Sequence, residues 1–153
     1  MLDQVRRIST EICEVRLMSC DLCDTVGGEL LWQDAHCRIV RVDDPAYAGF
    51  CRVIWQQHVR EMTDLSKDER THFMSIVFAV EEILRAELQP EKINLASLGN
   101  MTPHLHWHVI PRFADDKNFP NPIWGSAVRT PRPSSNQAQL SAALKAALWH
   151  TLG

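Results

Sequence analysis

Three histidines alternate with apolar residues in the second half of the chain. His104, His106 and His108 stand two positions apart in the stretch 104–112, which reads HLHWHVIPR. On a β-strand, successive side chains point to opposite faces, so this spacing predicts three imidazoles on one face, about 6.5 to 7 Å apart, and an apolar core on the other. Imidazole changes its charge near neutral pH. One ring could therefore attack a phosphorus atom while a neighbouring ring donates to its oxygens.

Two simpler interpretations of the same histidines stay open from the residues alone. The alternating strand could present a solvated polar face, or it could only bind metal, as a histidine tag does. The surrounding Leu, Trp, Val and Ile residues argue against a tag.

Cys20 and Cys23 form a second group that could do chemistry. Their two-residue gap allows both thiolates to reach one tetrahedral ion, and sulfur and nitrogen donors favour zinc. The alternative is a pair of reduced, partly buried thiols. A redox dithiol fits less well, because no βαβ pattern surrounds the pair. The five cysteines form an odd count without an export signal, which favours reduced thiols or a metal site over disulfides.

Composition limits the classes of partner. The chain has 153 residues, is 45% hydrophobic and carries a net charge of −3. That charge gives no general attraction to nucleic acid. No apolar run is long enough to span a membrane, and the first residues lack a secretion signal, so we expect a cytoplasmic protein with no membrane partner.

The elements that must position these residues follow from periodicity. Runs rich in β-branched residues predict strands over 37–42, 51–55, 93–97 and 104–113. Ser66 with Glu69 forms a capping box that opens a long helix, which should end near Gln89, before Pro90. These runs predict an α+β domain with a mainly antiparallel sheet.

Both ends of the chain show helical spacing of apolar residues. We expect a helix over 1–18, a central domain over 19–125, and a linker with an amphipathic helix over 126–153. In the last of these, Leu140, Leu144 and Leu148 lie one turn apart, behind Ser135 or Asn136 as the N-cap.

The stretch from His104 to Ile110 matches His-φ-His-φ-His-φ-φ, where φ is apolar, at all seven positions. It resembles the signature of the histidine triad (HIT) family. Gly49 to His58 is similar to the family strand that reads Gly-His-φ-φ-Val-Ile-Pro-Lys-x-His. The resemblance covers roughly residues 20–124. It implies a HIT-like α+β fold, with a five-stranded sheet, one long helix, and further helices at both ends.

The resemblance also implies an activity, that of a nucleotide hydrolase or nucleotidyl transferase. Its substrates would be dinucleoside polyphosphates, nucleoside phosphoramidates or nucleotide sulfates, with no organic cofactor. By this likeness, His106 attacks the α-phosphate to give a nucleotidyl-histidine intermediate. His108 donates to the non-bridging oxygens, and His104 supports the site or binds metal.

Further ligand-binding residues are implied by position. Asn94 is similar to the family's polar residue near the phosphate or ribose, although it could simply satisfy backbone groups. Asn100 takes the place of a glutamine four residues before the triad. Asp43 or Asp44 follows a strand where the family has a ribose-binding acid, and either could equally be a turn residue. Trp124 could stack on a base or only pack.

The likeness completes the metal-ligand set. Some family members join a CxxC pair with the histidine that ends the Gly49–His58 strand and with the first histidine of the triad. Here those residues are His58 and His104, so the resemblance implies a structural zinc held by Cys20, Cys23, His58 and His104.

Two departures from the family pattern keep other functions open. Phe50 stands where many members have a fourth histidine, and Met101 stands where many have a Ser or Thr beside the leaving group. The chain could instead be a nucleotide-binding or sensing module with degenerate catalysis, or a zinc-binding scaffold.

The long helix is apolar over more than one face, which predicts a covering partner. Family likeness and the prevalence of two-fold assemblies favour a homodimer, with Phe78 and the strand from Ile93 at its interface. Alternatively, a terminal helix covers this face within one chain.

Overall fold

The computed structural model describes residues 19–131 and 136–153, and an antiparallel sheet of five strands forms its centre. Along the sheet the order is β1-β2-β3-β5-β4, and every neighbouring pair is antiparallel. The strands are β1 (Glu29–Gln33), β2 (Cys37–Arg41), β3 (Cys51–Trp55), β4 (Lys92–Ala96) and β5 (His106–Arg112). The predicted α+β class with a five-stranded antiparallel sheet is confirmed.

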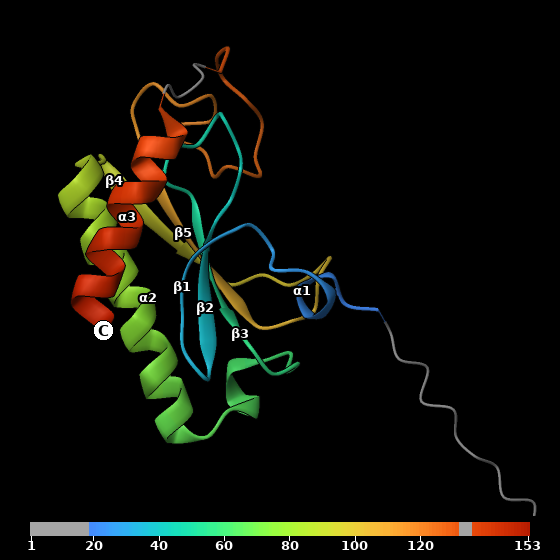
Figure 1. Cartoon of the computed structure of the whole chain (residues 1–153). Helices are drawn as coiled ribbons and strands as arrows, with labels where there is room; N and C mark the ends of the chain where they lie inside the picture. Colours follow the sequence, from blue (N-terminus) through green and yellow to red (C-terminus); the bar gives the residue numbers. More distant parts are fainter. Residues whose placement is uncertain (1–18, 132–135) are drawn as a thin grey trace, which may run out of the picture.

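Two long helices cover one face of this sheet. Figure 1 shows α2 (Lys67–Leu88) and α3 (Gln137–Leu152) side by side on that face, and the short α1 (Asp21–Asp24) on the other side of the sheet. A 3₁₀ turn (Met62–Asp64) leads into α2. One face of the sheet is therefore left to the histidines and to the loops around them.

The long helix begins and ends where the sequence predicts. Ser66 Oγ accepts from the Glu69 amide at 3.3 Å, and the Glu69 carboxylate accepts from the Ser66 amide at 2.7 Å. Gln89 closes the helix in the left-handed conformation, with φ 48°. Local chemistry thus fixes both ends of α2, the capping box at Ser66 and the left-handed Gln89 before Pro90.

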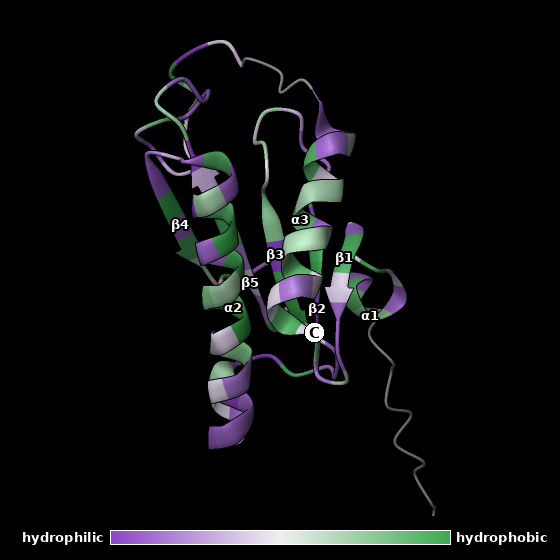
Figure 2. Cartoon of the chain, turned by 60° about the vertical axis from the view of Figure 1, so that its left-hand side comes forward, coloured by the Kyte–Doolittle hydropathy of each residue, from purple (hydrophilic) through white to green (hydrophobic). Residues whose placement is uncertain are grey.

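The main core lies between the sheet and the two helices, where the apolar stripes turn inward (Figure 2). Leu144 and Leu148 of α3 belong to this core, so the C-terminal helix packs on α2 and β1. Asn136 precedes α3 at φ 77°, but its side chain makes no capping bond to the helix. Ser135 and the predicted helix over 1–18 lie outside the described residues.

Two strand predictions need adjustment. β1 was not among the four predicted runs, because Glu29–Gln33 offers only three consecutive apolar residues and no β-branched one. The triad strand begins at His106 rather than His104, since His104 lies in the loop that leads into β5. That loop, and not strand alternation, sets where the first imidazole points.

Within the described parts of the chain, the helices are too short or too polar to cross a membrane.

Candidate active site and metal centre

The histidines lie on the sheet face that the long helices leave open. His106 pairs with Ile54 of β3, and His108 pairs with Arg52, so these four side chains share one face. All three histidines are buried, with exposures of 1% for His104, 7% for His106 and 5% for His108. The expectation that the triad shares an imidazole face holds for the two histidines within β5.

A backbone hydrogen bond fixes the tautomer of His106. Its Nδ1 lies 2.6 Å from the His104 carbonyl oxygen. A carbonyl can only accept, so Nδ1 carries the proton and Nε2 keeps a lone pair. That lone pair faces the Nε2 of His108 at 3.2 Å, which makes the His108 Nε2–H the donor. His106 therefore presents a nucleophilic nitrogen, and His108 a proton, at one point.

The two rings are closer than strand spacing alone suggests. Their centroids lie 4.8 Å apart at an angle of 82°, an edge-to-face pair. The side chains rotate toward each other instead of forming a row about 6.5 to 7 Å apart. This rotation brings the two Nε2 atoms within reach of one phosphate group.

Aromatic rings enclose His108. Phe50 lies 5.6 Å and Trp124 lies 5.0 Å from its ring, centroid to centroid. Its Nδ1 is buried and has no hydrogen-bond partner among the described residues. Burial, followed by the charges of His106 and Arg52, lowers the pKa of His108 to about 3. Burial also lowers the pKa of His106, so both rings are neutral at pH 7.

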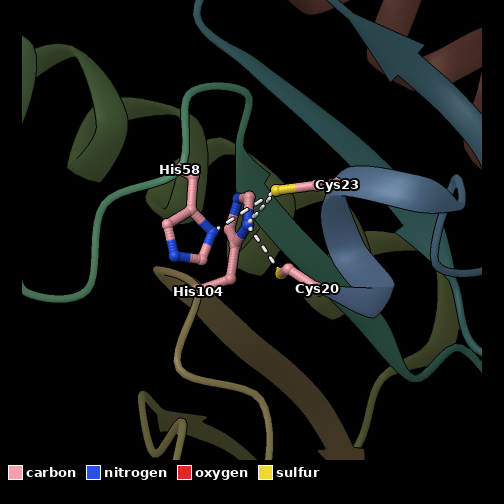
Figure 3. Close-up of side chains that lie close together, drawn as sticks. All are labelled: Cys20, Cys23, His58 and His104. Atoms are coloured by element: carbon pink, nitrogen blue, oxygen red, sulfur yellow. Dashed lines mark hydrogen bonds between the residues drawn. The ribbon is translucent and has the colours of Figure 1, made fainter. Parts of the chain in front are cut away.

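His104 belongs to a different group. Its Nδ1 lies 3.4 Å from the Sγ atoms of both Cys20 and Cys23, and the His58 Nδ1 lies 3.3 Å from Cys23 Sγ. Figure 3 shows the two rings and the two sulfur atoms converging on one point. The four candidate ligand atoms all lie within 4.8 Å of one another, as the resemblance implies.

These distances fit a tetrahedral zinc ion. Zn–S bonds of about 2.3 Å and Zn–N bonds of about 2.0 to 2.1 Å place the ligand atoms about 3.3 to 3.8 Å apart. His104 Nε2–H donates to the Trp55 carbonyl at 2.6 Å, which leaves Nδ1 free to bind metal. Burial, and then the neighbouring Cys20, raises the pKa of Cys23. A cation would relieve this crowding of two thiolates.

Another possible ligand group, Asp34, Cys37 and His72, has a structural explanation. The Asp34 carboxylate accepts from the backbone amides of His36 and Cys37 and pairs with His72 Nε2 at 2.6 Å. Burial raises the pKa of the Cys37 thiol well above its usual value. These contacts tie the β1–β2 turn to α2 without a metal.

Comparison with known proteins identifies the domain. The family model described as "HIT domain" matches residues 26–115, more than half of the chain. The chain belongs to the HIT family. The solved structure of a histidine triad protein from Sinorhizobium meliloti shares 25% identity with this HIT chain at a TM-score of 0.69, covering 80% of this chain and 91% of that one.

Two other relatives, both mycobacterial, differ in the share of their own length that this chain covers. A Mycobacterium tuberculosis protein named AP-4-A phosphorylase is 29% identical over 90 residues, 55% of this HIT chain and 46% of that protein. The chain thus spans about half the length of the curated M. tuberculosis relatives that it matches. A Zn-bound histidine triad family protein from Mycobacterium smegmatis has the same fold, with a TM-score of 0.65 at 21% identity over 88% of this chain and 96% of that one.

Asn94 lies on β4 of the HIT domain, with one half of its amide already held. Its Oδ1 accepts from Arg112 Nη1 at 2.8 Å, and Arg112, only 2% exposed, also binds the Asp116 carboxylate at 2.8 and 2.9 Å. Asn94 lines a hollow of about 690 Å³ together with Lys92, Leu98 and Trp124. No hydrogen bond of the Asn94 amide NH₂ is seen among the described residues, so this group could meet a ligand there.

The structure does not bring every predicted ligand residue of the HIT domain to the triad. Asp43 is exposed and lies 3.7 Å from Arg41 Nη1, and Arg41 in turn reaches Ser141 of α3 on the opposite face. Asp44 Oδ1 accepts from the Ala46 amide, as a turn residue does. Asn100 is exposed in the loop before β5 and makes no hydrogen bond to a histidine among the described residues.

The two departures from the family pattern have visible consequences. Phe50 packs against His108 but offers no polar atom, in keeping with the unpartnered His108 Nδ1. Met101 is 98% exposed in the loop before β5.

One functional candidate escaped the sequence analysis. Arg52 lies on the histidine face next to His108, inside a strand that periodicity marks only as apolar. A charged residue within such a run was the available signal, because a strand buried on both faces rarely includes an arginine without a polar role.

Proposed function

We propose that this HIT protein is a nucleotide hydrolase or nucleotidyl transferase that cleaves at an α-phosphate through a nucleotidyl-His106 intermediate. The observation that carries the proposal is the lone pair on His106 Nε2, set by the bond from Nδ1 to His104 and directed at the His108 proton. A neutral, oriented imidazole is what attack on phosphorus requires.

The first displacement joins His106 to the nucleotide. The Nε2 lone pair forms a bond to the α-phosphorus, and the bond from phosphorus to the leaving oxygen or nitrogen breaks, with its electron pair going to the leaving group. The His106 ring then becomes positive, and its Nδ1–H remains bonded to the His104 carbonyl, which stabilises that charge.

The second displacement restores the enzyme. Water, or another oxygen acceptor in a transferase, attacks the α-phosphorus, and the electron pair of the P–N bond returns to His106 Nε2. The proton of the attacking water is lost to solvent or to the phosphate group. Turnover of a dinucleoside polyphosphate and of a nucleoside phosphoramidate by the purified protein tests the proposal.

His108 would stabilise negative charge on the non-bridging oxygens. Its Nε2–H points to the place where the phosphate meets His106. We expect His108→Ala to lower kcat by about 10²- to 10³-fold, the effect of losing one oxyanion donor. Steady-state kinetics measures this loss, and a kcat within about threefold of wild type would remove His108 from the mechanism.

The substrate class rests on similarity and on the hollow along β4, which is lined in part by Asn94 and Trp124. The relative named AP-4-A phosphorylase supports a dinucleoside polyphosphate, and the amide of Asn94 and the ring of Trp124 line a hollow large enough for a nucleoside. We propose that Asn94 holds the phosphate or ribose, and that Asp43 and Asn100 reach the substrate only if their loops move.

Cys20, Cys23, His58 and His104 would hold the zinc ion, a structural role with no open coordination position. When bound, the ion neutralises the two thiolates and holds the segments around them together. His104 is the link to catalysis, because its carbonyl orients His106. The reduced thiols of this site suit a cytoplasmic protein.

A nucleotide-binding or sensing module is the second candidate. Phe50 removes a polar partner from His108, and Met101 provides no proton to a leaving group, so slow chemistry is consistent with both. Tight nucleotide binding with no turnover of either substrate class would favour this function. A pure zinc scaffold would bind neither.

We also propose a homodimer. β4 is an edge strand, and Phe78 of α2 is 50% exposed even though α3 packs against the same helix. We expect a mass of about 35 kDa by light scattering at micromolar concentration, twice the chain mass of 17.5 kDa. Phe78→Glu should shift the mass toward that of one chain, because it places a charge in the apolar contact. A single-chain mass for both proteins would contradict the dimer.

A further inference from the structure

Three arginines lie on the histidine face of the sheet, and two of them are fully engaged. Arg38 donates to the carbonyls of Leu22, Thr25 and Val26 and to the Gln56 side chain. Arg112 donates to Asp116, Asn94 and the Asn121 carbonyl. Both guanidinium groups therefore have structural explanations.

Arg52 differs from both. Its Nε is buried without a hydrogen-bond partner among the described residues, and its one polar contact there is Nη1 to the Gly27 carbonyl at 3.5 Å. It forms no ion pair within residues 19–131 and 136–153. Its guanidinium carbon lies 5.7 Å from the ring centroid of Phe50, a weak cation–π contact. An arginine stays protonated even though burial lowers the pKa of this one.

Arg52 lies next to the triad. It pairs across the sheet with His108, whose Nε2–H meets the His106 lone pair. The family resemblance leads one to expect an apolar residue at position 52. Among the described residues this partly buried cation has no counter-charge, and a bound anion would supply one.

Building on the proposed function, we propose that Arg52 is a substrate-binding residue that holds phosphate oxygens of the nucleotide at the His106–His108 site. The fork of N–H donors in arginine matches the oxygens of phosphate, and hydrogen bonds between charged partners are the strong ones. Arg52 pairs across the sheet with His108 and so puts a full positive charge beside the site, which would offset the charge of the phosphate. This favours substrates with more phosphate charge over those with less.

The test compares ligands that differ only in the phosphate. Calorimetry on the 153-residue protein as purified first ranks AMP, GMP, CMP and UMP, and the tightest is then compared with its own nucleoside. We expect Arg52→Gln to weaken nucleotide binding by about 10- to 100-fold and nucleoside binding by less than about twofold. Arg52→Lys, which keeps the charge but loses the fork, should fall between. Arg85→Gln, an exposed site on α2, is the matched control and should bind as wild type does.

Stability measurements separate this role from a structural one. Without ligand, Arg52→Gln should melt at or above the wild-type temperature, whereas Arg38→Gln, which loses several short bonds, should melt lower. If Arg52→Gln fails to fold, Arg52→Met takes its place, because it keeps the apolar stem. An equal loss of nucleotide and nucleoside affinity would assign Arg52 to the nucleoside, and an unchanged nucleotide affinity would exclude it from binding. Either result overturns the proposal.

Failure of the proposed function has a different signature. If the wild-type protein binds none of the four nucleotides, inorganic pyrophosphate serves as the probe in a thermal shift assay. If pyrophosphate stabilises wild type but not Arg52→Gln, the anion-binding role of Arg52 is supported and the nucleotide function is rejected. No stabilisation of either would overturn both.

Discussion

His106→Asn is expected to abolish turnover while leaving nucleotide binding within a few-fold of wild type. The amide keeps the polarity and approximate size of the imidazole, and its NH₂ can still donate to the His104 carbonyl. It has no ring nitrogen to form the bond to phosphorus. We expect kcat to fall by about 10⁴-fold or more, the scale seen when a covalent nucleophile is removed. Steady-state kinetics and calorimetry together separate the loss of chemistry from a loss of affinity.

Two other results for His106→Asn would contradict this expectation. A His106→Asn protein that turns over at the wild-type rate would mean that water attacks the phosphorus directly and that His106 only positions it. A protein that loses binding as well as turnover would assign His106 to the ligand pocket.

Loss of the zinc site is expected to have the second largest effect. We expect about one zinc per chain in untagged protein, and its loss in His58→Asn or Cys23→Ser. Because the site joins α1, the segment after β3 and the loop before β5, metal-free protein should melt about 10 °C lower or more. Elemental analysis and thermal unfolding with and without chelator measure both effects.

His36→Asn is the control for His58→Asn. His36 is also exposed, but it stacks on Trp55 outside the ligand group. It should keep the metal and nearly all of the stability. Protein that contains no metal and whose Cys20 and Cys23 thiols react freely in the folded state would rule out the zinc site.

The parts of the fold that sequence reasoning predicts are those whose signals are local. The capping box at Ser66 and the left-handed end at Gln89 depend on neighbouring residues, so the bounds of α2 follow from the sequence. β1 is short and bulged, and it exists because β2 provides a partner, which no local pattern reveals. The packing of α3 into the main core likewise depends on contacts distant in sequence.

The candidate site shows the same division. The two-residue spacing of His106 and His108 predicts that they share one face of the strand. The family resemblance implies all four candidate zinc ligands. The sequence does not show that Asp43 is exposed and lies near Arg41, whose side chain bonds to Ser141 of α3 on the other face of the sheet. The role proposed for Arg52 depends on which of the three arginines has a buried donor without a partner among the described residues, and only the folded structure distinguishes them.

The most direct test of the central claim is to trap the covalent intermediate. The protein is mixed briefly with a dinucleoside polyphosphate or a nucleoside phosphoramidate, denatured at a pH that preserves P–N bonds, digested and measured by mass spectrometry. We expect one nucleoside monophosphate on the peptide that contains His106, and none in His106→Asn. Rapid turnover in wild type with no adduct at the earliest times, or an adduct that persists in His106→Asn, would contradict a nucleotidyl-His106 mechanism.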